Sequence, residues 1–119
     1  MEQLADITRF KERYTIVLEG FDPVSAGGFT QVPNFILKNA QVSSNAKVAY
    51  ALLLSYAWNF DRVFPGQGRM AEDMGTSQPT VARAIAELEK IGYLDIERRG
   101  QGLTNVYVLH HSVQKKNKK

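Results

Sequence analysis

The side chains with the clearest chemistry in this sequence are hydrogen-bonding groups placed within about one helical turn of each other. Gln78, Thr80 and Arg83 bring an amide, a hydroxyl and a guanidinium into one short stretch. An amide pairs with adenine, a threonine contacts a thymine methyl or a phosphate, and a guanidinium binds guanine or phosphate. Ser77, just before them, can cap a helix whose free N–H groups favour an anion. The pattern indicates contact with nucleic acid.

Further polar and basic side chains flank this stretch. Arg98 and Arg99 adjoin a glycine-rich turn, where basic residues reach phosphates or the minor groove. Gln67 and Arg69 begin a short predicted helix, from which they can position the protein on phosphates. The predicted binding residues are Gln67, Arg69, Ser77, Gln78, Thr80, Arg83, Arg98, Arg99, Gln101 and Asn105.

These assignments have simpler structural alternatives. Ser77 is a helix cap whatever else it does, and Thr80 can simply support the first turn. Arg83 can pair with Glu87, although exposed pairs of this spacing contribute only about 0.3–0.5 kcal/mol. Glu87 and Glu89 have the pattern of solvated surface charge. The arginines beside the glycine-rich turn can belong to a solvated hairpin tip.

Catalytic and metal-binding groups are scarce. The chain has no cysteine, which excludes disulfides, cysteine-ligated zinc and thiol nucleophiles. His110 and His111 are adjacent on a predicted strand, so they point to opposite faces and do not share a metal ion. Residues 64–69 contain two glycines but lack the lysine and hydroxyl of a phosphate-binding loop. We therefore expect no enzymatic activity, no cofactor and no metal site.

Length and composition indicate one folded domain. The chain has 119 residues, 44% of them hydrophobic, with a formal net charge of +3 and a pI of about 9.3. No apolar run approaches the roughly 20 residues that span a bilayer, and the N-terminus lacks the pattern of a secretory signal. We expect a cytoplasmic protein with no membrane partner.

Turn-forming residues and changes in composition divide the chain into three segments. They are an N-terminal arm over residues 1–29, a domain over 30–110 and a basic tail over 111–119. The arm has apolar residues at helical spacing and then a strand-like run over 14–18, and it can pack on the domain, pair with a second copy or stay mobile. The lysines of the tail can add salt-sensitive affinity for DNA or simply form a solubilising end.

Three helices are predicted in the first part of the domain. Residues 30–32 form a short extended segment, and Asn34 can cap a short helix. Ser43 or Ser44 caps a second, longer helix. The apolar stripe of this longer helix consists of Val48, Ala49, Leu52, Leu53 and Tyr56. A third helix covers about residues 67–74.

A tight turn at Gly75 leads into the next helix. Glycine takes the left-handed conformation at a helix end without a side-chain penalty. Ser77 can then cap the new helix, with Pro79 in a first turn that needs no intrahelical N–H. The apolar face of this helix consists of Val81, Ala84, Ile85, Leu88 and Ile91, before Gly92 ends it. Two helices joined by such a turn form a helix-turn-helix.

A β-hairpin is predicted after that helix. Leu94 and Ile96 alternate with polar residues on a first strand, and Val106 and Val108 alternate on a returning strand. Residues 99–102 between them have the composition of a turn. The order of elements predicts an α+β fold, a winged helix-turn-helix with three to four helices and a C-terminal hairpin as the wing.

Two stretches resemble known families. Residues 71–94 (AEDMGTSQPTVARAIAELEKIGYL) resemble the helix-turn-helix of winged bacterial DNA-binding proteins, and GTSQPTV within them resembles the turn of GntR-type regulators. Residues 32–109 are similar to the winged-helix domain of plasmid and phage replication initiators, through VPN, residues 43–54, FP and IGYL. GntR-type relatives carry an arginine where this chain has Ala82, and Arg83 follows one position later.

The resemblance implies sequence-specific binding of double-stranded DNA by a bacterial or mobile-element protein. Replication initiation is the first expectation and transcriptional regulation the alternative, because this fold serves many roles. A further alternative is a protein-interaction or oligomerisation module. A homodimer is compatible with DNA binding, since two half-sites extend recognition. No ligand-sensing domain is evident, so no small-molecule effector is expected.

Overall fold

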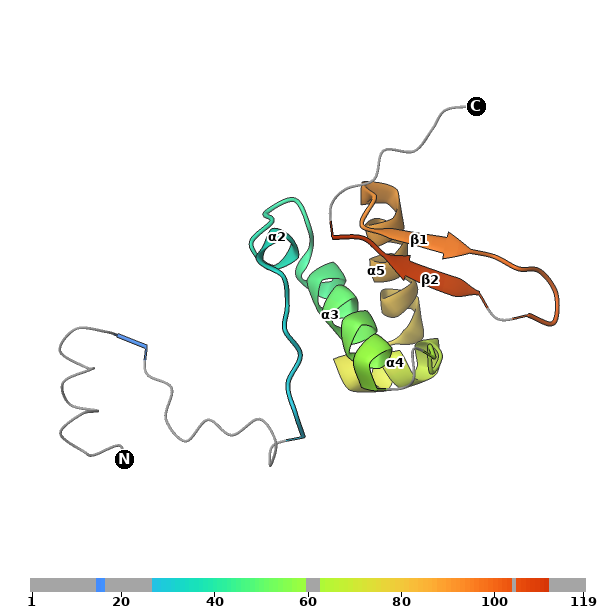
Figure 1. Cartoon of the computed structure of the whole chain (residues 1–119), viewed down its shortest axis with the longest axis horizontal. Coiled ribbons are helices and arrows are strands. Elements are labelled where there is room, and N and C mark those ends of the chain that lie inside the picture. The colour runs from blue at the N-terminus through green and yellow to red at the C-terminus, as the bar shows by residue number, and fades with distance from the viewer. Residues whose placement is uncertain (1–14, 17–26, 60–62, 104, 112–119) are drawn as a thin grey trace.

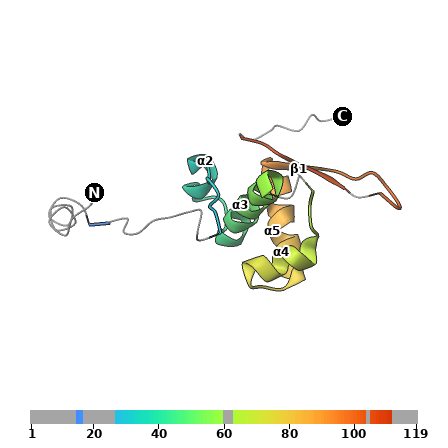
Figure 2. The same cartoon turned by 60° about the horizontal axis from the view of Figure 1, so that its bottom comes forward.

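Four helices and a two-stranded antiparallel hairpin follow one another along the part of the chain that the structure describes (Figure 1). This computed structural model describes residues 15–16, 27–59, 63–103 and 105–111. The elements are α2 (Asn34–Leu37), α3 (Ser44–Asn59), α4 (Gln67–Met74), α5 (Gln78–Ile91), β1 (Leu94–Glu97) and β2 (Val106–Leu109). The fold is the predicted α+β winged helix, and its hairpin extends away from the helices (Figure 2).

The chain enters α2 through a proline rather than through the predicted asparagine cap. Pro33 is the N-cap residue, with φ −63° and ψ 141°, and Asn34 is the first residue of the helix. The Pro33 carbonyl accepts the backbone N–H groups of Ile36 and Leu37 at 3.2 and 3.0 Å, so the turn closes without a side-chain cap. The prediction that Asn34 is the cap was wrong by one position.

Helix α3 begins with a cap that involves two helices. The Ser43 hydroxyl accepts the backbone N–H of Ala46 at 3.1 Å, which identifies Ser43 rather than Ser44 as the cap. Ser43 in turn donates its backbone N–H to Glu87 Oε2 at 2.8 Å and its hydroxyl to Glu87 Oε1 at 2.6 Å. A capping box takes its glutamate from the same helix, whereas here α5 supplies it. The prediction that Glu87 is a solvated charge was therefore wrong.

Replacing Glu87 by alanine is expected to lower the free energy of unfolding by about 1–2 kcal/mol, because two hydrogen bonds to a carboxylate are lost at a helix start. The measurement is urea denaturation followed by circular dichroism. Glu72→Ala, which removes an exposed carboxylate from α4, should change stability by no more than about 0.5 kcal/mol. Equal effects of the two changes would show that the cap contributes nothing.

The core lies where α2, α3, α4, α5 and β1 meet. Its fully buried large side chains are Ile36, Met70, Val81, Leu88 and Leu94. On α5 the buried residues are those the sequence predicted, with Ile91 half-buried. On α3 the buried residues are Ala46, Ala49, Tyr50, Leu53 and Tyr56. Val48, which the sequence placed in the buried stripe of α3, is 46% exposed. The buried face of α3 is therefore rotated relative to the prediction, because the helix has apolar residues around much of its own circumference.

Three aromatic rings join α2, α3 and the start of the hairpin. The ring of Phe35 lies 6.0 Å from that of Tyr50 and 5.5 Å from that of Tyr93. The Tyr50 hydroxyl donates to the carbonyl of His110 at 2.6 Å, which fastens the end of β2 to α3. Burial raises the pKa of this hydroxyl above its usual value, so it remains a donor at neutral pH.

The hairpin turns its larger apolar side chains toward the core. Leu94 pairs with Leu109 and Ile96 with Tyr107, so these four residues share the inward face. Val108 is 41% exposed, so Tyr107 rather than Val108 faces inward on the returning strand. Side chains alternate along a strand, so the register that pairs Tyr107 with Ile96 sends Val108 outward.

Several predictions fall on residues that the structure does not describe. The predicted helix of the N-terminal arm and most of its strand-like run lie outside the described residues, as does the tail from residue 112 onward. Those predictions stay as they are. Among the helices that are described, none has the length and hydropathy of a transmembrane span.

Candidate nucleic-acid interface

The turn between α4 and α5 has the geometry that the sequence predicted. Gly75 adopts the left-handed conformation with φ 70° and ψ 37°. The N–H of Thr76 donates to the Ala71 carbonyl and that of Gly75 to the Glu72 carbonyl, which is a Schellman motif. Ser77 then caps α5 by accepting the N–H of Thr80 at 3.3 Å. The chain reverses within a few residues and leaves the start of α5 at the surface.

The outward face of α5 is polar near its N-terminus and has small alanine side chains farther along the helix. Gln78 and Arg83 are exposed, and Thr80 is half-buried. The other exposed residues on α5 are Pro79, Ala82, Ala86 and Lys90. Figure 1 shows that α4 and the start of α5 lie at the end of the domain opposite α2. The structure thus brings Ser77, Gln78 and Arg83 together on one accessible surface.

Arg83 contacts its own helix rather than an acid. Its Nη2 donates to the Thr80 hydroxyl at 3.2 Å, and that oxygen lies 3.1 Å from the Ser77 hydroxyl. The alternative that Arg83 pairs with Glu87 was wrong, because Glu87 holds the N-terminus of α3. Among the described residues Arg83 forms no ion pair. Its positive charge is therefore not compensated by a neighbouring carboxylate.

The two predicted residues at the start of α4 have different surroundings. Gln67 is the first residue of the helix and is half-buried. Arg69 is exposed and lies in an ion pair with Asp73 at 3.2 Å, and Tyr56 donates to the same carboxylate at 2.8 Å. Burial and this hydrogen bond raise the pKa of the Tyr56 hydroxyl, so it remains the donor. Asp73 thus fixes the direction in which Arg69 leaves the helix.

Gln78 lies against the preceding helix. A Cβ atom at Gly68 would come within 3.3 Å of Gln78 Nε2, closer than ordinary van der Waals contact. Gly68 has an ordinary helical backbone, so its small size is needed for this approach and not for its φ angle. The side-chain amide of Gln78 thus lies close to Gly68 of α4.

Gly68→Ala is expected to weaken binding to a preferred duplex severalfold, because the new methyl group displaces the Gln78 amide. Stability should stay the same or rise by up to about 1 kcal/mol, since alanine favours a helix over glycine. Fluorescence anisotropy and thermal unfolding measure the two quantities. In a Gln78→Ala background the Gly68→Ala change should have no further effect on affinity. An equal loss in both backgrounds would refute a route through Gln78.

The predicted wing residues divide into an anchored arginine and a more distal group. Arg98 forms a two-pronged ion pair with Glu89 on α5, at 3.0 and 3.2 Å. The prediction that Glu89 is a solvated charge was wrong, since the pair fastens the end of β1 to α5. Arg99, Gln101 and Asn105 are exposed along the loop between the strands. The wing therefore leaves the helices at an angle that Arg98 helps to set.

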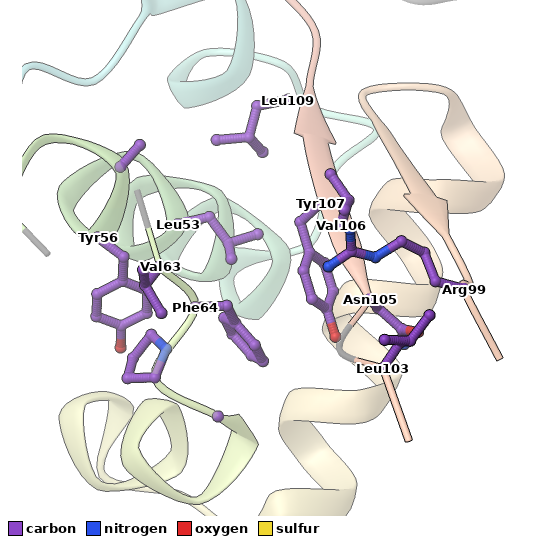
Figure 3. A pocket seen from close by; sticks show the side chains of 13 residues that line it. Leu53, Tyr56, Val63, Phe64, Arg99, Leu103, Asn105, Val106, Tyr107 and Leu109 are labelled. Carbon is purple, nitrogen blue, oxygen red and sulfur yellow. The ribbon is translucent and has the colours of Figure 1, made fainter. Parts of the chain in front are cut away.

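An apolar groove runs between the wing and the segment that precedes α4. It has a volume of about 720 Å³, and Arg99, Leu103 and Asn105 line its wing side (Figure 3). At its floor the rings of Phe64 and Tyr107 lie 4.5 Å apart. This ring contact joins β2 of the wing to the segment that precedes α4. Sequence reasoning missed it, because nothing in the spacing of Phe64 indicates a partner on β2.

Comparison with known proteins finds one matching family model. Residues 40–94 match the family model of a helix-turn-helix domain, a stretch that runs from just before α3 to the start of β1. No curated protein and no solved structure matches the chain. The match supports a helix-turn-helix DNA-binding domain, and the hairpin that follows the matched region gives the domain the architecture of a winged helix.

Proposed function

We propose that this protein binds double-stranded DNA in a sequence-specific manner, with the N-terminal part of α5 in the major groove. The observation that carries the proposal is that Ser77, Gln78 and Arg83 are all exposed at the start of α5. In a helix-turn-helix the first residues of the recognition helix reach base edges. Ala82 and Ala86 on the same outward face are small enough for α5 to approach the bases closely.

The distribution of acidic groups supports this orientation. Glu87 is turned toward Ser43 at the start of α3, and Glu89 toward Arg98 on the wing. Asp73 is held by Tyr56 and by the side chain of Arg69. These carboxylates near the motif are thus engaged within the domain. A phosphate backbone along α5 would meet Arg83 and Lys90 on its exposed side.

Selection from a pool of random duplexes tests sequence specificity. The purified protein is mixed with the pool at two salt concentrations, and the bound fraction is sequenced. We expect one motif to be enriched and the affinity to fall steeply with salt, because phosphate contacts release counterions. Salt-sensitive binding without enrichment would contradict sequence specificity, and no binding at all would contradict a role in DNA recognition.

Within this function we propose replication initiation by a plasmid or phage-type protein, with transcriptional regulation as the alternative. Support comes from the resemblance of residues 32–109 to replication initiators, which extends beyond the helix-turn-helix on both sides. Footprinting on the DNA that flanks the gene separates the two roles. An initiator should protect repeated sites at an origin, whereas a regulator should protect an operator and change the output of a promoter.

One observation favours a second candidate, a protein-interaction module. Val63 and Leu103 at the rim of the apolar groove are 61% and 60% exposed. Replacing Arg83, Arg98 and Arg99 by alanine together should abolish DNA binding if the first proposal holds. If this triple variant keeps its DNA affinity and also keeps any self-association seen by sedimentation, the result would favour the protein-interaction module. The same sedimentation run on the wild type tests whether the protein forms a homodimer.

A further inference from the structure

Three side chains at the start of α5 form a continuous hydrogen-bonded row. Arg83 Nη2 donates to Thr80 Oγ1 at 3.2 Å, and Thr80 Oγ1 lies 3.1 Å from Ser77 Oγ. Ser77 Oγ also accepts the Thr80 backbone N–H at 3.3 Å. Residues three apart on a helix lie on the same face, so the row follows the outward edge of the first turn. It links the helix cap directly to the guanidinium.

The bond between Arg83 and Thr80 has a fixed direction, because arginine can only donate. Thr80 Oγ1 must therefore accept from Arg83. The hydroxyls of Ser77 and Thr80 have one proton each, and one of these lies between the two oxygens. The remaining hydroxyl proton has no acceptor within the row. Together with the guanidinium, this proton gives the row donors that face outward and can meet acceptors on a ligand.

Arg83 differs in this respect from two other arginines of the candidate interface. Arg69 and Arg98 are each held by a carboxylate, Asp73 and Glu89, which neutralises much of their charge. Arg83 is held by a neutral hydroxyl instead, which orients the guanidinium and leaves its charge intact. An oriented donor pair on a free charge suits the O6 and N7 acceptors of guanine. A phosphate contact would place weaker demands on orientation.

We propose that Thr80 is a positioning residue that holds Arg83 ready to read a guanine, and that it makes no essential DNA contact of its own. This proposal rests on the proposed binding of double-stranded DNA through α5. A side chain that is ordered before binding loses less conformational entropy on binding. Thr80 therefore contributes to affinity and to base preference through Arg83.

A double-mutant cycle tests the coupling. The full chain is prepared as wild type, Thr80→Val, Arg83→Ala and the double variant, and each is titrated against the selected duplex. Thr80→Val keeps the branched shape and removes the hydroxyl. It should weaken binding by about twofold to twelvefold, which corresponds to the cost of immobilising one long side chain. In the Arg83→Ala background the same change should have almost no effect, because contacting residues that act as a unit are not additive.

Three further measurements, of base preference, of salt dependence and of rescue by serine, make the result decisive. Thr80→Val should lose preference for guanine at one position of the motif while the slope of affinity against salt stays the same, and Thr80→Ser should restore the preference. An equal loss from Thr80→Val in both backgrounds, or none in either, would overturn the role of Thr80. If the wild type itself enriches no motif, the proposed function fails, and that outcome is recognised before any variant is compared.

Discussion

Replacing Arg83 by alanine is expected to weaken binding to the selected duplex by roughly 5-fold to 150-fold, the range for losing one good base contact of about 1–3 kcal/mol. Arg83 is exposed on the outward face of α5 and forms no ion pair with the residues described. Its loss should change the free energy of unfolding by no more than about 0.5 kcal/mol. Anisotropy titrations at fixed salt, together with denaturation curves, measure both quantities.

The matched control for Arg83→Ala is Lys38→Ala. Lys38 is the exposed C-cap residue of α2, at the end of the domain away from α4 (Figure 1). Removing this cation lowers the net charge by the same amount, so it corrects for long-range attraction to DNA. We expect Lys38→Ala to leave affinity within about twofold of the wild type, as for a charge beyond the Debye length of the contact. Equal losses from the two variants would mean that α5 has no special role.

The largest effect on stability is expected from Leu88→Ala. Leu88 is fully buried on α5, and its backbone carbonyl accepts the N–H groups of Gly92 and Tyr93 that end the helix. Truncating it should cost about 2–5 kcal/mol, from lost burial and from the cavity left behind. For a domain of this size the Tm should fall by at least about 8 °C. Differential scanning calorimetry measures the shift.

Two comparisons sharpen the Leu88 experiment. Lys90→Ala removes an exposed side chain from the same helix and should leave the Tm almost unchanged. If Leu88→Ala does not fold, Ile85→Val on the same buried face removes a single methylene-sized group and should cost about 0.5–1.5 kcal/mol. If Leu88→Ala lowers the free energy of unfolding by no more than about 0.5 kcal/mol, which is the usual effect at a surface site, α5 does not anchor the core.

The helix-turn-helix could be predicted from sequence because its signals are local. Gly75 in the left-handed conformation, the Ser77 cap and Gly92 at the helix end each act within a few residues of the backbone they shape. The bounds of α4 and the buried face of α5 followed from them. A glycine, a cap and a 3.6-residue period carry this information without tertiary contacts.

The acidic partners could not be predicted, because they join distant parts of the chain. Glu87 caps α3 across 44 residues, and Glu89 holds Arg98 through the docking of the wing. Neither spacing differs from that of solvated charge on a helix. The inward face of β2 could not be predicted either, because all four of its residues are apolar or aromatic and the register depends on β1. The sequence thus predicted a set of candidate binding residues without the contacts that orient them.

The measurement that tests the central claim most directly is an amide chemical-shift titration of the labelled protein with the selected duplex. We expect the largest shifts over residues 77–83, with further shifts over the described wing residues 98–103, and almost none in α2. That result would identify the start of α5 as the part of the domain that meets DNA. Shifts concentrated on α2 and the apolar groove, with residues 77–83 unchanged, would contradict the proposed interface.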